Sequence, residues 1–155
     1  MKVAILSESS ADEAAVRILV DGLLGRQSLP IHPPPLRSRG WPSVRQILPA
    51  VLKHLYYQTD AEALVVVVDS NHSPVHQEAH DQPEGGDERC RLCQLRKAVD
   101  RVQGEVRLLP NRPRIKTAVG IAVPAIEAWF LCGSDPRVSE AAWVDGLQSE
   151  SCPYT

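Results

Sequence analysis

The sequence predicts a three-layer α/β domain, in which helices cover both faces of a mostly parallel central sheet. Two uninterrupted apolar runs, VAIL at residues 3–6 and LVVVV at residues 64–68, are typical of strands buried on both faces. Segments in which apolar residues recur at helical spacing lie between and after these runs. Strands and helices therefore alternate along the chain, which is the pattern of a Rossmann-like sheet.

The individual elements follow from local signals. Ser10 and Glu13 have the spacing of a capping box at the start of a first helix, and Gly25 is a suitable stop. Pro42 favours the first turn of a second helix. The other expected elements are a short strand within residues 29–33, a central strand at 63–69, a helix at 89–103, strands at 105–109 and 117–123, and a helix at 124–131.

The length of 155 residues suits one domain with its own core. We expect this domain to span residues 1–132, with a His- and Cys-rich insert at residues 70–93. Residues 133–155 lack a clear closing element, as in a chain cut from a longer protein or one with a poorly ordered tail.

Composition excludes several classes of protein. The net charge of −2 gives no general attraction for nucleic acid or for a membrane surface. No apolar run reaches the roughly 18 residues that span a bilayer, so we expect no membrane association. The N-terminus resembles a first strand and not a signal peptide, which predicts a cytoplasmic protein.

Two acids follow expected strands at the edge where open α/β sheets bind ligands. Glu8 follows the first strand, and Asp69 ends the central one. If these strands are neighbours, the carboxylates converge, and a divalent cation such as Mg²⁺ would hold both ionised. Asn71 would add a neutral oxygen. Alternatively, Glu8 lies at the positive end of the first helix and Asp69 bonds its own loop.

Three segments carry a family resemblance: VAILSESSADEAAVRILV at residues 3–20, VVVVDSN at 65–71 and AVPAIEAWFL at 122–131. The first two resemble the motifs of the TOPRIM fold, a Glu after one strand and an Asp-x-Asp after another. Together the three are similar to a bacterial TOPRIM-like family described as DUF4276, which resembles the TOPRIM part of OLD-family nucleases. The resemblance covers most of residues 2–132.

This resemblance implies Mg²⁺- or Mn²⁺-dependent phosphodiester chemistry of nuclease type, in phage defence or DNA maintenance. Glu8 and Asp69 would be the metal-binding acids of such an enzyme. Asn71 stands where the family pattern has a second Asp, and this neutral, weaker ligand weakens the catalytic interpretation. Glu127 could be an additional acid, although a Glu in the first turn of a helix is stabilising in any case. Trp129 reads as a core residue.

Basic residues flank the same expected edge and could hold a nucleic-acid backbone. Each of them also reads as an ordinary solvated residue. They are Arg37, Arg39, Arg112, Arg114 and Lys116.

The insert predicts a second, separate site. His76, His80, Cys90 and Cys93 can close around one ion, and four ligands of this kind are typical of structural Zn²⁺. Cys93 could instead be a core thiol, and a Cys-x₂-Cys pair can also be a redox motif. His72 lies nearer the acidic edge and could belong to that site.

Two main hypotheses of function result. The first is the TOPRIM-like nuclease, an enzyme acting on nucleic acid. The alternative is a non-catalytic, zinc-stabilised module that binds a partner protein or domain and carries a degenerate acidic site. A third reading, a phosphoacceptor domain with Asp69 as acceptor, lacks the usual acidic pair after the first strand.

Overall fold

The computed structural model describes residues 1–34, 40–71, 73–82, 85–123, 125–126 and 129. In chain order its elements are β1 (Lys2–Leu6), α1 (Ser10–Leu24), β2 (Leu29–Ile31), α2 (Trp41–Gln58), β3 (Ala63–Asp69), the 3₁₀ turn η1 (Glu78–Asp81), α3 (Arg91–Glu105) and β4 (Lys116–Ala122). The chain divides into two compact units. The first contains Met1–Val67 and Gln94–Gly120, and the second contains Val68–Cys93 and the residues from Ile121 onward.

The four strands form one parallel sheet in the order β2-β1-β3-β4. Val3 of β1 lies opposite Ala63 of β3, and Leu6 lies opposite Val66. The predicted α/β class and the central position of the strand at 63–69 are therefore confirmed. The order also makes β1 and β3 neighbours, which is the condition on which the predicted acidic edge depends.

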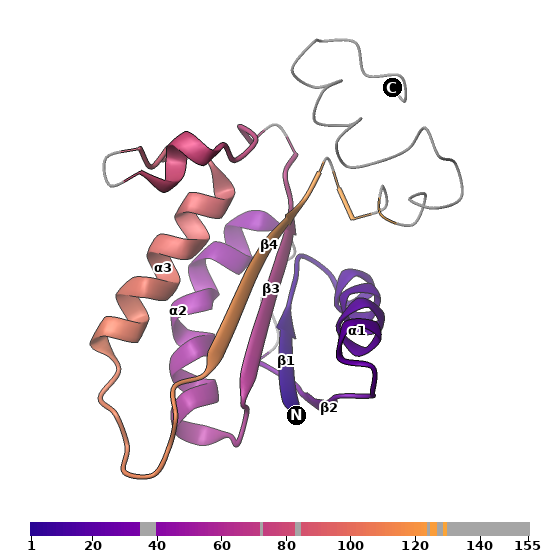
Figure 1. The fold of residues 1–155 in the computed structure, drawn as a ribbon, viewed down its shortest axis with the longest axis vertical. Helices are drawn as coiled ribbons and strands as arrows, with labels where there is room; N and C mark the ends of the chain where they lie inside the picture. Colours follow the sequence, from indigo (N-terminus) through magenta and orange to yellow (C-terminus); the bar gives the residue numbers. More distant parts are fainter. Residues whose placement is uncertain (35–39, 72, 83–84, 124, 127–128, 130–155) are drawn as a thin grey trace. The chain divides into compact units, whose positions relative to one another are not determined.

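Helices lie on both sides of the sheet in the first unit. Figure 1 shows α1 on one side and α2 and α3 on the other. The strand order explains this arrangement, because crossovers between parallel strands are right-handed. The step from β1 to β2 runs in one direction along the sheet, and the steps from β2 to β3 and from β3 to β4 run in the opposite direction, so their helices cover opposite faces.

The core lies around the two central strands. In β1 and β3 the buried side chains follow one another without alternation, as expected for strands covered on both faces. The edge strands β2 and β4 are more exposed. Side chains that are fully buried include Leu6, Leu48, Leu55, Leu64, Leu95, Val3, Val44 and Val66.

The cap of α1 differs from the prediction by one residue. Ser9, not Ser10, is the N-cap, and its Oγ accepts a hydrogen bond from the Asp12 N–H at 3.2 Å. Ser9 has the extended backbone that an N-cap requires, whereas Ser10 is already helical. The predicted stop is confirmed, because Gly25 has a φ of 63° in the left-handed region.

The predicted strand at residues 105–109 is wrong. Glu105 ends α3, and the following residues form a loop. Two tyrosines of α2 satisfy this loop: the Tyr57 hydroxyl accepts from the Arg107 N–H and the Tyr56 hydroxyl from the Leu109 N–H, both at 3.0 Å. These alternate backbone donors therefore bond side chains instead of a neighbouring strand.

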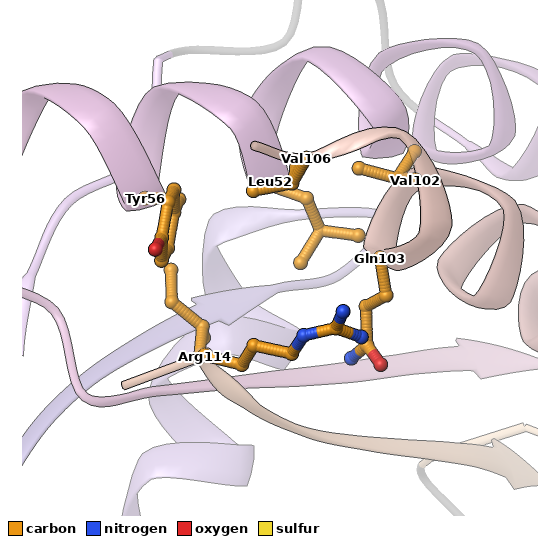
Figure 2. Close-up of a pocket in the computed structure, with 7 residues that line it drawn as sticks. Leu52, Tyr56, Val102, Gln103, Val106 and Arg114 are labelled. Atoms are coloured by element: carbon orange, nitrogen blue, oxygen red, sulfur yellow. The ribbon is translucent and has the colours of Figure 1, made fainter. Parts of the chain in front are cut away.

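A small cavity lies between α2, α3 and the segment that precedes β4 (Figure 2). Its walls are mainly apolar, with Leu52 on α2 and Val102 on α3, and Arg114 extends along it. The cavity measures about 20 Å³, room for about one water molecule. We interpret it as a gap in the packing of the first unit.

The remaining predicted elements agree with the structure or lie outside it. The helix expected from Pro42 begins at Trp41, and the helix expected at 89–103 is α3. Most of the helix expected at 124–131 and the whole tail from 133 lie outside the described residues. None of the helices that the structure describes combines the length and apolar character needed to cross a bilayer.

Candidate metal centre

Four side chains of the second unit form a compact group that could hold a metal ion. They belong to His76, His80, Cys90 and Cys93, and their candidate ligand atoms all lie within 4.8 Å of one another. His76 lies in the loop after β3, and His80 lies in η1. Cys90 immediately precedes α3, and Cys93 lies in its first turn. The grouping predicted from the sequence is therefore present.

The separations within the group match those around a tetrahedral ion. The Nδ1 atom of His76 lies 3.7 Å from the Cys90 sulfur and 3.5 Å from the Cys93 sulfur. The Nδ1 atom of His80 lies 3.7 Å from the Cys93 sulfur. Zinc bond lengths at tetrahedral angles place a sulfur and a nitrogen about 3.6 Å apart. The three separations therefore suit a single ion bound by both sulfurs and both Nδ1 atoms.

Local backbone geometry brings the histidines together. The His80 N–H donates to the Gln77 carbonyl at 2.8 Å, which forms the 3₁₀ turn and folds His80 back toward His76. The two imidazole rings meet edge to face, with centroids 5.3 Å apart. Both Nδ1 atoms can then face the cysteines.

The cysteines are placed by the turn that begins α3. The Cys90 N–H donates to the Asp87 carbonyl at 3.1 Å, and the Arg91 N–H donates to the Ser73 hydroxyl at 3.1 Å. Cys93 follows Cys90 by one helical turn, so both sulfurs lie near the N-terminus of the helix. The two cysteines form no disulfide.

Burial affects the chemistry of the thiols. Cys90 is only 1% exposed, and burial raises the pKa of its thiol. The neighbouring Cys93 thiol contributes in the same direction. A thiolate at this position is therefore unfavourable without a compensating cation, which a bound metal ion would supply. The Cys93 sulfur lies close to two imidazole nitrogens, and this favours the metal interpretation over the core-thiol alternative.

A fifth residue, Asp81, contacts the group and was missed in the sequence. Its Oδ1 atom lies 3.1 Å from Nε2 of His76, the ring nitrogen that does not face the thiols. Metal-binding histidines commonly donate their second N–H to such a carboxylate. An Asp in an acid-rich loop carries no distinguishing sequence signal, so only the structure identifies it.

Glu8, the first candidate acid, lies in the first unit beside the start of α2. Its backbone carbonyl accepts from the Gly40 N–H at 3.3 Å, and a Cβ atom added to Gly40 would lie 3.7 Å from Glu8 Oε2. Gly40 is the N-cap of α2. The positive end of that helix therefore stabilises the Glu8 carboxylate.

Asp69, the second candidate acid, belongs to the second unit and ends β3. Its Oδ1 accepts a hydrogen bond from the Ile126 N–H at 2.9 Å. This partner is 57 residues away in the sequence, so the contact is not the bond to its own loop that the alternative interpretation of Asp69 predicts. Glu8 and Asp69 belong to different units.

The backbone conformation at position 71 explains why an Asn is suitable there. Its φ of 29° lies in the left-handed region, which Asn tolerates better than most residues. Its carbonyl and that of Asp69 accept from the guanidinium of Arg91, at 3.4 and 2.7 Å. This contact of Arg91 with the end of β3 was also missed in the sequence.

Of the other predicted site residues, some belong to described segments and the rest lie outside them. Arg112 donates to the Leu55 carbonyl at 3.0 Å and lies over the Tyr56 ring, so part of its guanidinium is engaged within the first unit. Lys116 begins β4. Trp129 is partly exposed, and its N–H donates to the Ile126 carbonyl. Arg37, Arg39, His72 and Glu127 lie outside the described residues.

Fold and site together define an α/β protein with a candidate His₂Cys₂ metal centre. Comparison with family models, curated proteins and solved structures finds no match for this chain. The resemblance to TOPRIM-like proteins therefore stays a prediction from its three sequence motifs.

Proposed function

We propose that this chain is a zinc-stabilised α/β module in which His76, His80, Cys90 and Cys93 hold one structural Zn²⁺. The observation that carries the proposal is the spacing of the ligand atoms. Three sulfur–nitrogen separations of 3.5 to 3.7 Å agree with the value of about 3.6 Å for a tetrahedral zinc site.

The ligand types support zinc and a structural role. Two thiolates and two imidazoles suit a borderline-soft ion that favours tetrahedral geometry. Four protein ligands leave no coordination position for water or substrate, as is usual where zinc stabilises a fold.

The insert has few buried residues, so a bound metal ion would stabilise its fold. Among the described residues from 68 to 93, only Val68, Ser70 and Cys90 are buried. So few buried side chains provide little hydrophobic stabilisation for a segment of this length. A metal bound by ligands from both ends of the insert would contribute its binding free energy to folding.

The test is the zinc content of the purified full chain, determined by elemental analysis. We expect one zinc per chain in the wild type and a large loss in Cys90→Ser and in His80→Ala. His54→Ala is the control, because His54 lies on α2 in the first unit. Circular dichroism verifies that the variants fold. A wild-type chain without zinc, or an equal loss in the control, would contradict the proposal.

A second candidate function is divalent-metal-dependent phosphodiester chemistry at Glu8 and Asp69, as the TOPRIM-like resemblance implies. The observation in its favour is that β1 and β3 are adjacent parallel strands. Glu8 follows the carboxyl end of β1, and Asp69 is the last residue of β3. The partner would then be nucleic acid, and the bound cation would be Mg²⁺ or Mn²⁺.

Asp69→Asn provides a sharp test of this second function. The amide keeps an oxygen that can accept from the Ile126 N–H, but it removes the charge needed for the cation. We expect Mn²⁺-dependent cleavage of nucleic acid in the wild type and its loss in Asp69→Asn. Asp100→Asn, an exposed substitution on α3, should keep it. Cleavage that survives Asp69→Asn unchanged would exclude this role for Asp69.

A further inference from the structure

We propose that the metal centre fixes the backbone at the carboxyl end of β3, and that Arg91 transmits this effect. Arg91 lies between the two candidate metal-binding cysteines in the sequence. The inference rests on the proposed zinc site and adds a positioning role for a residue outside the ligand group.

Hydrogen bonds on both sides of Cys90 tie the start of α3 to residues 69–73. The Arg91 guanidinium donates to the carbonyls of Asp69 and Asn71, at 2.7 and 3.4 Å. The Arg91 N–H donates to the Ser73 hydroxyl at 3.1 Å, and that hydroxyl also lies 3.3 Å from the Arg89 carbonyl. All of these residues belong to the second unit.

The metal would fix Arg91 because of its place in the chain. Only Arg91 and Leu92 separate the two cysteines, so an ion bound by both sulfurs closes a short ring that includes the Arg91 backbone. Such a ring restricts the backbone of the first turn of α3. It therefore also fixes the Cα position from which the Arg91 side chain extends.

The strand end needs this support. Asn71 has a φ of 29°, a conformation that costs free energy unless surrounding contacts maintain it. Hydrogen bonds from a guanidinium are stronger than those between neutral groups, so Arg91 is a suitable stabiliser of this turn. The same segment carries Asp69, the acid invoked for phosphodiester chemistry. Metal binding would thereby position that residue without contacting it.

Hydrogen exchange of the full chain tests the coupling. The Ser70 N–H donates to the Ala122 carbonyl at 2.7 Å and the Ser73 N–H to the Ser70 carbonyl at 2.8 Å, so both amides report on this turn. We expect removal of zinc by a chelator to accelerate their exchange about tenfold or more, as for loss of a charged hydrogen bond.

Arg89 and Arg91 flank Cys90 in the sequence. Variants of these two residues distinguish coupling through Arg91 from a general loss of stability. Arg91→Ala should keep one zinc per chain but exchange rapidly at Ser73 with zinc present. Arg91→Lys should recover part of the protection, because an ammonium can donate to the Asp69 carbonyl. Arg89→Ala should behave as the wild type, because the Arg89 side chain is 82% exposed and pairs with Asp87.

The outcomes distinguish this inference from the proposal on which it rests. A wild-type chain that binds no zinc contradicts the zinc site itself. A chain that binds zinc but shows unchanged exchange at Ser70 and Ser73 after chelation contradicts only the coupling. Protection in Arg91→Ala equal to that in the wild type also overturns the role of Arg91.

Discussion

The Nε2 atom of His76 lies 3.1 Å from the Oδ1 atom of Asp81, while Nδ1 of the same ring faces the two thiols. When Nε2 carries the proton and donates it to the carboxylate, the lone pair of Nδ1 is directed toward the space between the sulfurs. Asp81 therefore selects the tautomer of His76 that can bind a metal ion.

Removal of the Asp81 carboxylate should weaken zinc binding. We expect Asp81→Ala to lower the affinity about 10- to 100-fold, the usual effect of losing such a partner. Asp81→Asn should have a smaller effect, because its amide oxygen can still accept the proton. Competition with a zinc-sensitive dye measures these affinities. Glu78→Ala, at an exposed position in the same 3₁₀ turn, is the control. Equal affinities for Asp81→Ala and Glu78→Ala would show that the carboxylate has no such role.

The effect of substituting Asn71 on the free energy of unfolding should depend on how well the new residue adopts a positive φ. Gly adopts positive φ without strain, so Asn71→Gly should change the free energy of unfolding little. Asn71→Val should lower it by roughly 1–2 kcal/mol, the cost of a left-handed conformation for a residue with a bulky Cβ. Urea denaturation measures both variants. If Val is tolerated as well as Gly, the turn is not constrained at this residue.

The core of the first unit should respond to loss of side-chain volume. Leu48 on α2 is fully buried, whereas Leu23 on α1 is 90% exposed. Leu48→Ala should lower the free energy of unfolding by about 2–5 kcal/mol. Leu23→Ala, the same chemical change at a solvated position, should stay within about 0.5 kcal/mol of the wild type. Similar losses in the two variants would contradict the described packing of α2.

Asp21 should make stability depend on pH. Hydrogen bonds from the Ser28 hydroxyl and from the Ser28 backbone hold the pKa of Asp21 below its ordinary value of 3.8. Because the folded pKa is lowered, this stabilisation is complete above the ordinary value and is lost as the pH falls through the lowered one. NMR titration should show the Asp21 pKa rising in Ser28→Ala. An unchanged pKa in that variant would exclude the hydroxyl as the main cause.

Sequence patterns predicted most of the sheet and the four candidate ligands. The strand at 63–69 is recognisable because burial on both faces leaves an uninterrupted apolar run, and the metal group is recognisable because its ligands lie close together in sequence. The pattern of residues 105–109 wrongly predicted a strand. The hydroxyls of Tyr56 and Tyr57, which are distant in sequence, accept hydrogen bonds from backbone N–H groups of this segment.

Backbone angles and contacts between distant residues explain the other differences between the predicted and the observed structure. The cap at Ser9 was one residue from its predicted place because adjacent serines are equivalent in composition and differ only in backbone angles. The roles of Asp81 and Arg91 depend on tertiary proximity to His76 and Asp69, which no spacing rule encodes.

X-ray absorption at the zinc edge of the purified chain tests the proposed metal centre most directly, because it reports the type and distance of the bound atoms. We expect two sulfurs at about 2.3 Å and two nitrogens at about 2.0–2.1 Å from the ion. Cys93→Ser should remove one sulfur from this shell, and His54→Ala should leave the shell unchanged. A shell made only of oxygen and nitrogen atoms, with no sulfur, would contradict the His₂Cys₂ centre.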